Sequence, residues 1–219
     1  MADFSIGRIL RKGFGGLFDA HGRDARMQFW MFLALVLAPL LILQMIIQMV
    51  LAFPPMDLMM NAGPKDPQAA VKIFEAQMRG MTTGAYVGAC LGLLGAIILL
   101  TATARRLHDR GHSGWWALAL PFGVAAAGLG QARQMLHMTD RLPQVLAEVQ
   151  RQPPSMNPFD SWTWMAKANV NDAGPDWLAI VGGLILLWLL IELARAGTAG
   201  SNRFGPAPDQ DGSARPGRP

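Results

Sequence analysis

Long apolar stretches alternate with short charged ones along this chain, and the alternation predicts its main elements. Residues 29–53 form a stretch of 25 without a formal charge, and residues 84–104 form one of 21. A third runs from Trp177 to Ile191, 15 residues, before Glu192 intervenes. An α-helix crosses the ~30 Å hydrocarbon core of a bilayer with about 20 residues. The first two stretches therefore predict membrane-spanning helices, and the third does so if its span extends to residue 194.

The apolar stretch that starts at Trp115 is shorter and leaves two interpretations open. It reaches only to Gly130, is rich in small residues and contains Pro121. A stretch of this length is either a re-entrant segment or, if it extends to Ala132, a complete span.

The distribution of basic residues favours a complete span. Spans are expected at 29–53, 84–104, 115–132 and 177–194. Residues 1–28, 105–114 and 195–219 then share one side and carry twelve of the 19 Lys and Arg residues, whereas 54–83 and 131–176 carry seven. Because basic residues stay on the cytoplasmic side, we expect an all-α protein with four transmembrane helices and both termini in the cytoplasm. The loops 54–83 and 131–176 would be periplasmic.

Outside the predicted membrane domain, 29–198, the pattern predicts smaller elements. The mixture of apolar and basic residues in segment 1–28 predicts an interfacial helix between Phe4 and Phe18. Apolar residues recur at helical spacing in 67–80 and 142–151, with Pro143 in a first helical turn, which predicts short amphipathic helices in both outer loops. The tail 199–219 is polar and rich in Gly and Pro, so we expect its end to be disordered.

Composition agrees with a membrane protein and excludes some partners. Over half of the residues are apolar and 16% are charged, against about 25% in soluble domains. The net charge of +4 follows the predicted topology, so we expect no nucleic-acid partner. Cys90 is the only cysteine, and no cofactor or metal is expected.

Small and amide side chains predict contacts between the spans. Gly84, Gly88 and Gly92 form two consecutive GxxxG steps, a pattern that lets a neighbouring helix approach closely; small residues of the third span are the expected counterparts. Gln44 and Gln48 lie one turn apart in the first span. We interpret them as interhelical hydrogen-bond partners rather than as a polar pathway.

Candidate binding chemistry gathers on the predicted cytoplasmic side. Its arginines are Arg23, Arg26, Arg105, Arg106, Arg110 and Arg203. They suit an anion or lipid-headgroup site, because guanidinium groups match phosphate geometry. Alternatively, they anchor the topology on anionic lipid at ~1 kcal/mol each, or pair with Asp24 and Asp109 to lock the loops together. We expect locking and anchoring to explain more than a specific anion site. Other expected structural residues are His108, Gly111, Gly114, Trp115, Trp116 and Asn202.

The segment His108-Asp109-x-x-His112 also has the residue types of a metal site. Histidines four residues apart share a helix face, as in zinc-protease motifs. Gly111 interrupts the helix, however, and no glutamate follows the first histidine. We therefore expect these side chains to contact the backbone of a turn instead.

Three blocks resemble the bacterial inner-membrane family DUF805. They are Gly22-Arg23-Asp24-Ala25-Arg26-Met27-Gln28-Phe29-Trp30, the central Arg105-Arg106-Leu107-His108-Asp109-Arg110-Gly111-His112-Ser113-Gly114-Trp115-Trp116, and Gly200-Ser201-Asn202-Arg203-Phe204-Gly205-Pro206-Ala207-Pro208. Ala207 replaces an acidic residue of the family pattern, and the outer loops are longer. The resemblance implies a multi-pass inner-membrane protein and no particular activity.

These observations favour a non-catalytic role. We expect a binding or scaffolding protein whose arginine-rich cytoplasmic face engages lipid headgroups, particularly anionic ones, or a membrane or cytoplasmic protein partner. The alternative is a small-solute transporter or channel component, although Glu192 is the only charge within a predicted span and transport pathways usually need more. A third interpretation is a metal-dependent enzyme that uses His108, Asp109 and His112.

Overall fold

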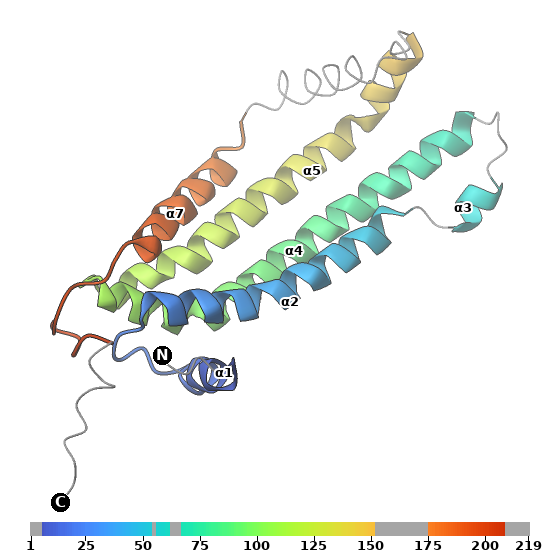
Figure 1. Ribbon diagram of the computed structural model, residues 1–219. Coiled ribbons are helices and arrows are strands. Elements are labelled where there is room, and N and C mark those ends of the chain that lie inside the picture. The colour runs from blue at the N-terminus through green and yellow to red at the C-terminus, as the bar shows by residue number, and fades with distance from the viewer. Residues whose placement is uncertain (1–5, 54–55, 62–66, 152–174, 209–219) are drawn as a thin grey trace, which may run out of the picture. The chain divides into compact units, whose positions relative to one another are not determined.

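The computed structural model describes residues 6–53, 56–61, 67–151 and 175–208 (Figure 1). Its elements are α1 (Ile6–Gly15), α2 (Arg26–Ala52), α3 (Met56–Asn61), α4 (Pro67–Asp109), the 3-10 helix η1 (Gly114–Leu118), α5 (Ala119–Arg151) and α7 (Trp177–Ala194). Within these ranges there is no strand, only an isolated bridge between Asn202 and Gly205. The expected all-helical fold is confirmed for the described residues.

Three described helices are long and apolar enough to cross a membrane: Arg26–Ala52, Glu75–Asp109 and Trp177–Ala194. They correspond to the first, second and fourth predicted spans. Helix α5, which contains the third, is not among them. Its apolar part ends at Gly130, and Gln131, Arg133 and Gln134 follow in the same helix.

Two helices are longer than the sequence pattern predicted. The short helix expected at 67–80 continues into the second span, so that α4 has 43 residues. The helix expected at 142–151 is the end of α5, and Pro143 lies inside α5 rather than in a first turn. Good helix formers, mainly Gln, Met, Leu, Ala and Arg, fill the region before Pro143, so nothing breaks the helix there. Part of the outer loop 131–176, residues 152–174, lies outside the described residues.

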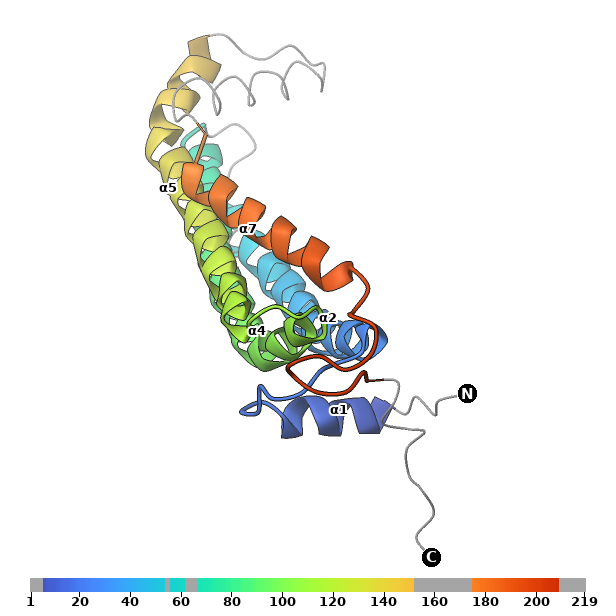
Figure 2. The same cartoon turned by 90° about the vertical axis from the view of Figure 1, so that its left-hand side faces the viewer.

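The chain divides into two compact units, of which the first contains residues 1–42, 91–125 and 182–219. Buried side chains of α2, α4 and α7 form its core, among them Phe29, Leu99, Leu107 and Leu189. Helix α1 also belongs to this unit (Figure 2). A Cβ atom on Gly13 would overlap the Phe32 ring of α2, so this glycine weakens the helix but allows it to dock.

The second unit contains residues 43–90 and 126–181. Here α2 contacts α4 through its glutamines: Gln44 Nε2 donates to the carbonyl of Gly84 at 3.0 Å. Cβ atoms on Gly84 and Gly88 would meet the side chains of Gln48 and Gln44, respectively. These two glycines therefore face α2 rather than the expected third segment. Gly92 lies in the first unit and does face α5, where its Cβ would be 3.2 Å from Val124.

Candidate functional site

The site lies at the C-terminal end of α4. Two backbone hydrogen bonds terminate this helix. The amide of His112 donates to the carbonyl of Leu107 at 3.0 Å, and that of Gly111 donates to the carbonyl of His108 at 2.9 Å. Gly111 has φ +77°. This pair of hydrogen bonds around a left-handed residue is a Schellman motif, which explains the glycine.

Asp109, the last residue of α4, is buried between two arginines. Its Oδ1 accepts hydrogen bonds from Arg23 Nε at 3.0 Å and Nη2 at 2.8 Å, and its Oδ2 accepts one from Arg106 Nη1. The remaining donors of Arg23 reach the chain after α7: Nη1 donates to the carbonyl of Gly200 at 2.7 Å and Nη2 to that of Thr198 at 2.8 Å. Arg23 thereby ties the segment before α2 to α4 and to the C-terminal segment.

Asp24 makes the equivalent connection to Arg105. Arg105 Nε donates to Asp24 Oδ2 at 2.8 Å, and its Nη1 donates to the carbonyls of Gly16 at 2.9 Å and Asp19 at 2.6 Å. Lys12 Nζ lies 2.9 Å from Asp24 Oδ1. Arg105 therefore holds the loop that follows α1. In the same loop, hydrogen bonds from the backbone and ring nitrogens of His21 lower the pKa of the exposed Asp19 carboxyl.

Arg106 and Arg110 point to the end of α7. Arg106 Nε donates to the carbonyl of Leu193 at 3.2 Å and its Nη2 to that of Arg195 at 2.5 Å. Arg110 Nη1 donates to the carbonyl of Ala196 at 2.8 Å. The last carbonyls of a helix have no partner within the helix and form the negative end of its dipole. Arg106 supplies such a hydrogen bond to Leu193, both arginines hold the carbonyls that follow the helix, and both supply compensating charge.

We call Arg23, Asp24, Arg105, Arg106, Asp109 and Arg110 the arginine hub. Arg106 is only 1% exposed, Arg105 6% and Arg23 8%. Burial of so many cations is tolerable only if each is paired and hydrogen-bonded. The two aspartates balance part of the charge, and carbonyls after α1 and at the end of α7 accept from the remaining donors. Most guanidinium donors are thus directed inward and are used by the protein itself.

Glu192 of α7, which sequence analysis treated as an isolated membrane charge, lies beside the hub in a cationic cluster. Its carboxylate accepts from Arg195 Nη1 at 3.0 Å and Arg110 Nη2 at 3.3 Å. His112 Nε2 lies 3.3 Å from Glu192 Oε2. The carboxylate is therefore paired rather than free.

The segment after α7 folds over the end of α4. Thr198 N donates to the carbonyl of Asp109 at 2.8 Å, and Asn202 Nδ2 donates to that of His108 at 2.9 Å. The Phe204 ring stacks on the His108 ring with centroids 3.9 Å apart. Asn202 and His108 were expected structural residues, whereas Thr198 and Phe204 were not, since neither residue type signals a contact with a distant helix end.

The residues of the possible metal motif have separate partners. His108 lies against Phe204 and has Nδ1 3.3 Å from the carbonyl of Gly22, while Asp109 binds two guanidinium groups and His112 pairs with Glu192. In the described part of the chain, no three His, Cys, Asp or Glu residues are placed to hold a metal ion. The three side chains of this motif therefore connect separate chain segments.

Two of the six candidate arginines lie outside the hub. Arg26 is exposed, and within the described ranges it makes no hydrogen bond or ion pair. Arg203 is also exposed; its Nη2 lies 3.2 Å from the carbonyl of Gly111, and its guanidinium lies 4.6 Å from the Phe204 ring centre. Trp115 and Trp116 are exposed as well. A surface anion would thus meet Arg26 and Arg203 more readily than the buried arginines.

Comparison with known proteins identifies the family of this chain. No curated protein and no solved structure matches the chain. The family model described as "Protein of unknown function (DUF805)" matches residues 17–206. This range includes the whole arginine hub and the C-terminal segment that covers it. The chain belongs to the DUF805 family.

Proposed function

We propose that this chain is a bacterial multi-pass inner-membrane protein with both termini in the cytoplasm, and that it acts by binding rather than by catalysis. Its cytoplasmic end would be a fixed platform that attracts anionic lipid headgroups. The observation that carries the proposal is the arginine hub, because it assembles three segments distant in sequence into one surface: the loop before α2, the end of α4 and the segment after α7.

The hub also supports four membrane crossings. The loop before α2 and the ends of α4 and α7 all contribute to it, so these three points would lie on one side of the membrane. After leaving the hub at the end of α4, the chain returns to it through α7. If α7 crosses the membrane, the chain must cross once more between Asp109 and Trp177. Of the described helices between these residues, α5 alone has the length for it.

The exposed arginines suit headgroups better than the buried ones do. Buried guanidinium groups already donate to carboxylates and carbonyls, so an anion could bind them only by displacing those partners. Arg26 and Arg203 are exposed near the hub, where each would contribute ~1 kcal/mol of attraction to an anionic leaflet. Their attraction would weaken with salt because exposed charges are screened.

Native mass spectrometry of the detergent-purified protein tests this function. With phosphatidylglycerol added, we expect Arg26→Gln and Arg203→Gln each to lower the retained lipid about fivefold, the equivalent of ~1 kcal/mol. Arg79→Gln is the matched control, since Arg79 is exposed in the second unit. Equal retention by all three variants and by the unaltered protein, at low and high salt, would contradict the proposal.

A further inference from the structure

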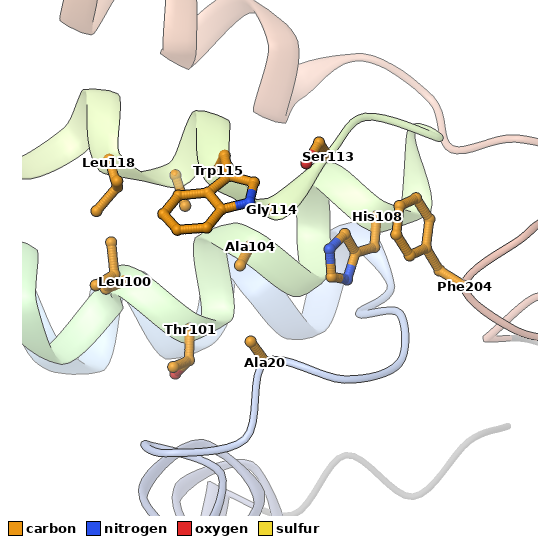
Figure 3. Close-up of a pocket in the computed structure, with 11 residues that line it drawn as sticks. Ala20, Leu100, Thr101, Ala104, His108, Ser113, Gly114, Trp115, Leu118 and Phe204 are labelled. Carbon is orange, nitrogen blue, oxygen red and sulfur yellow. The ribbon is translucent and has the colours of Figure 1, made fainter.

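A cavity of about 360 Å³ lies in the first unit between the end of α4 and η1 (Figure 3). Its main lining residues are Leu100, Thr101, Ala104, His108, Trp115 and Leu118. In Figure 3, Trp115 and Leu118 lie on one side of the opening and Leu100 and Thr101 on the other. Small-molecule sites in proteins occupy about 300–1,000 Å³, so the cavity can hold part of a ligand.

The lining specifies an apolar ligand with a neutral polar group. None of the lining residues is Asp, Glu, Lys or Arg, so a buried ion would find no partner there. The polar groups in the wall belong to His108, Ser113 and Thr101 and to the indole N–H of Trp115. They can exchange hydrogen bonds with an ester or a hydroxyl group.

The His108 ring is fixed in the cavity wall. Stacking on Phe204 and the contact between Nδ1 and the carbonyl of Gly22 set its orientation. Because a Cβ on Gly114 would lie 2.8 Å from His108 Nε2, a glycine is required opposite this nitrogen. The carbonyl of Gly22 can only accept, so its contact with the ring is a hydrogen bond when Nδ1 carries the proton.

The cavity is continuous with the outer apolar face of α4. Leu94 and Ile97 precede Thr101 and Ala104 at helical spacing and are 47% and 58% exposed. At the other wall Trp115 is 80% exposed, and indole rings prefer the border between hydrocarbon and headgroups. In a membrane, lipid would cover this exposed apolar face, so the cavity would open toward lipid near the headgroup level.

We propose that the cavity binds one acyl chain of a membrane phospholipid, with the glycerol ester region against Ser113, whose hydroxyl can donate to an ester oxygen. The proposal rests on the membrane location given under the proposed function. It adds a chain-binding site that is separate from the attraction between exposed arginines and headgroups.

The test uses the full chain in nanodiscs of phosphatidylcholine that carries a photoactivatable diazirine in one acyl chain. This lipid has no net charge, so the exposed arginines do not select it. We expect covalent labelling at the residues that line the cavity. Thr101→Phe fills the cavity and should lower that labelling about tenfold, the equivalent of lost contact with two methylene groups. The matched control is Ile97→Phe, one turn earlier on the same face, which should keep it.

The outcomes separate this proposal from the proposed function. Suppose that the cavity residues are labelled but that Arg26→Gln and Arg203→Gln retain as much phosphatidylglycerol as the unaltered protein. This result would refute the headgroup function and would support the acyl-chain site. Labelling in Thr101→Phe as strong as in the control would overturn the chain site. If Thr101→Phe fails to fold, as judged by its melting temperature, Leu118→Phe serves as the second filling variant with the same expected result.

Discussion

At the scale of single residues, the two neighbouring arginines of α4 have different tasks. Arg105 holds the loop after α1, whereas Arg106 holds the end of α7. Consecutive residues of an α-helix point about 100° apart, so a pair of arginines can serve two partners. The adjacent position of these residues in the sequence therefore does not indicate a shared anion.

The first prediction concerns the planar shape of Arg106. Arg106→Lys keeps the charge but cannot donate at once to Asp109 and to the carbonyls of Leu193 and Arg195. Loss of two such buried hydrogen bonds should lower the free energy of unfolding by about 2 kcal/mol. Thermal unfolding in detergent measures this loss of stability. Arg26→Lys, at an exposed position, should change stability by less than about 0.5 kcal/mol. Equal melting temperatures would refute a structural role for Arg106.

The residue types of the hub were predictable, but most of its acceptors were not. Asp24 and Asp109 were named as possible partners of the arginines because opposite charges lay in the same predicted loops. The carbonyls of Gly16, Leu193 and Gly200 also accept from these arginines. Every residue has a carbonyl, and only the folded positions of the helix ends and of the C-terminal segment determine which carbonyls are left for these arginines.

At the scale of elements, hydrophobic length located the helices better than it located their ends. The ranges predicted for the first and last spans nearly equal α2 and α7. Helices α4 and α5 are longer than the predicted spans, because residues with high helix propensity continue beyond their apolar parts. The length of an apolar stretch gives no information about such polar helical residues. The GxxxG pattern of Gly84 and Gly88 predicted close packing, but it gave no partner. Gln44 and Gln48, noted as interhelical hydrogen-bond residues, are that partner.

The second prediction compares three glycines of these helices. A Cβ on Gly130 of α5 would lie 2.5 Å from the backbone nitrogen of Ala179 in α7, and backbone cannot easily move. Gly130→Ala should therefore destabilise the protein most, by about 1–3 kcal/mol. Gly88→Ala would meet only the end of the Gln44 side chain, 2.8 Å away, and should cost less.

The control for this series is Gly183→Ala in α7, where no atom lies within 4 Å of the added Cβ. Alanine is the better helix former, so this variant should be as stable as the unaltered protein or up to about 1 kcal/mol more stable. Chemical unfolding in mild detergent gives the order. A Gly130→Ala protein more stable than Gly88→Ala would contradict the observed contact between α5 and α7.

At the scale of the whole molecule, the hub links the fold to the proposed topology. The distribution of basic residues predicts a common side for both termini. The folded chain supports it independently, because the loop before α2 and the ends of α4 and α7 contribute to one buried cluster. Length and composition did not decide whether α5 crosses the membrane, because its apolar part is short. The return of the chain to the hub through α7 favours a crossing by α5.

The third prediction tests this topology. Reporters fused to the N-terminus or after Arg195 should register in the cytoplasm, and reporters inserted at Lys65 or Asn157 should register in the periplasm. A cytoplasmic signal at Asn157 would show that α5 does not cross. A periplasmic signal after Arg195 would contradict the common side of both termini.

A double-mutant cycle between Arg23 and Asp109, which lie 86 positions apart, measures directly whether the hub holds the fold together. If it does, Arg23→Gln, Asp109→Asn and their combination should show a coupling energy of about 1.5–3 kcal/mol in unfolding. The cycle between Arg26 and Asp109 is the control and should be additive. Coupling below about 0.5 kcal/mol for Arg23 and Asp109, equal to the control, would contradict the claim that buried arginine pairs hold this end of the protein together.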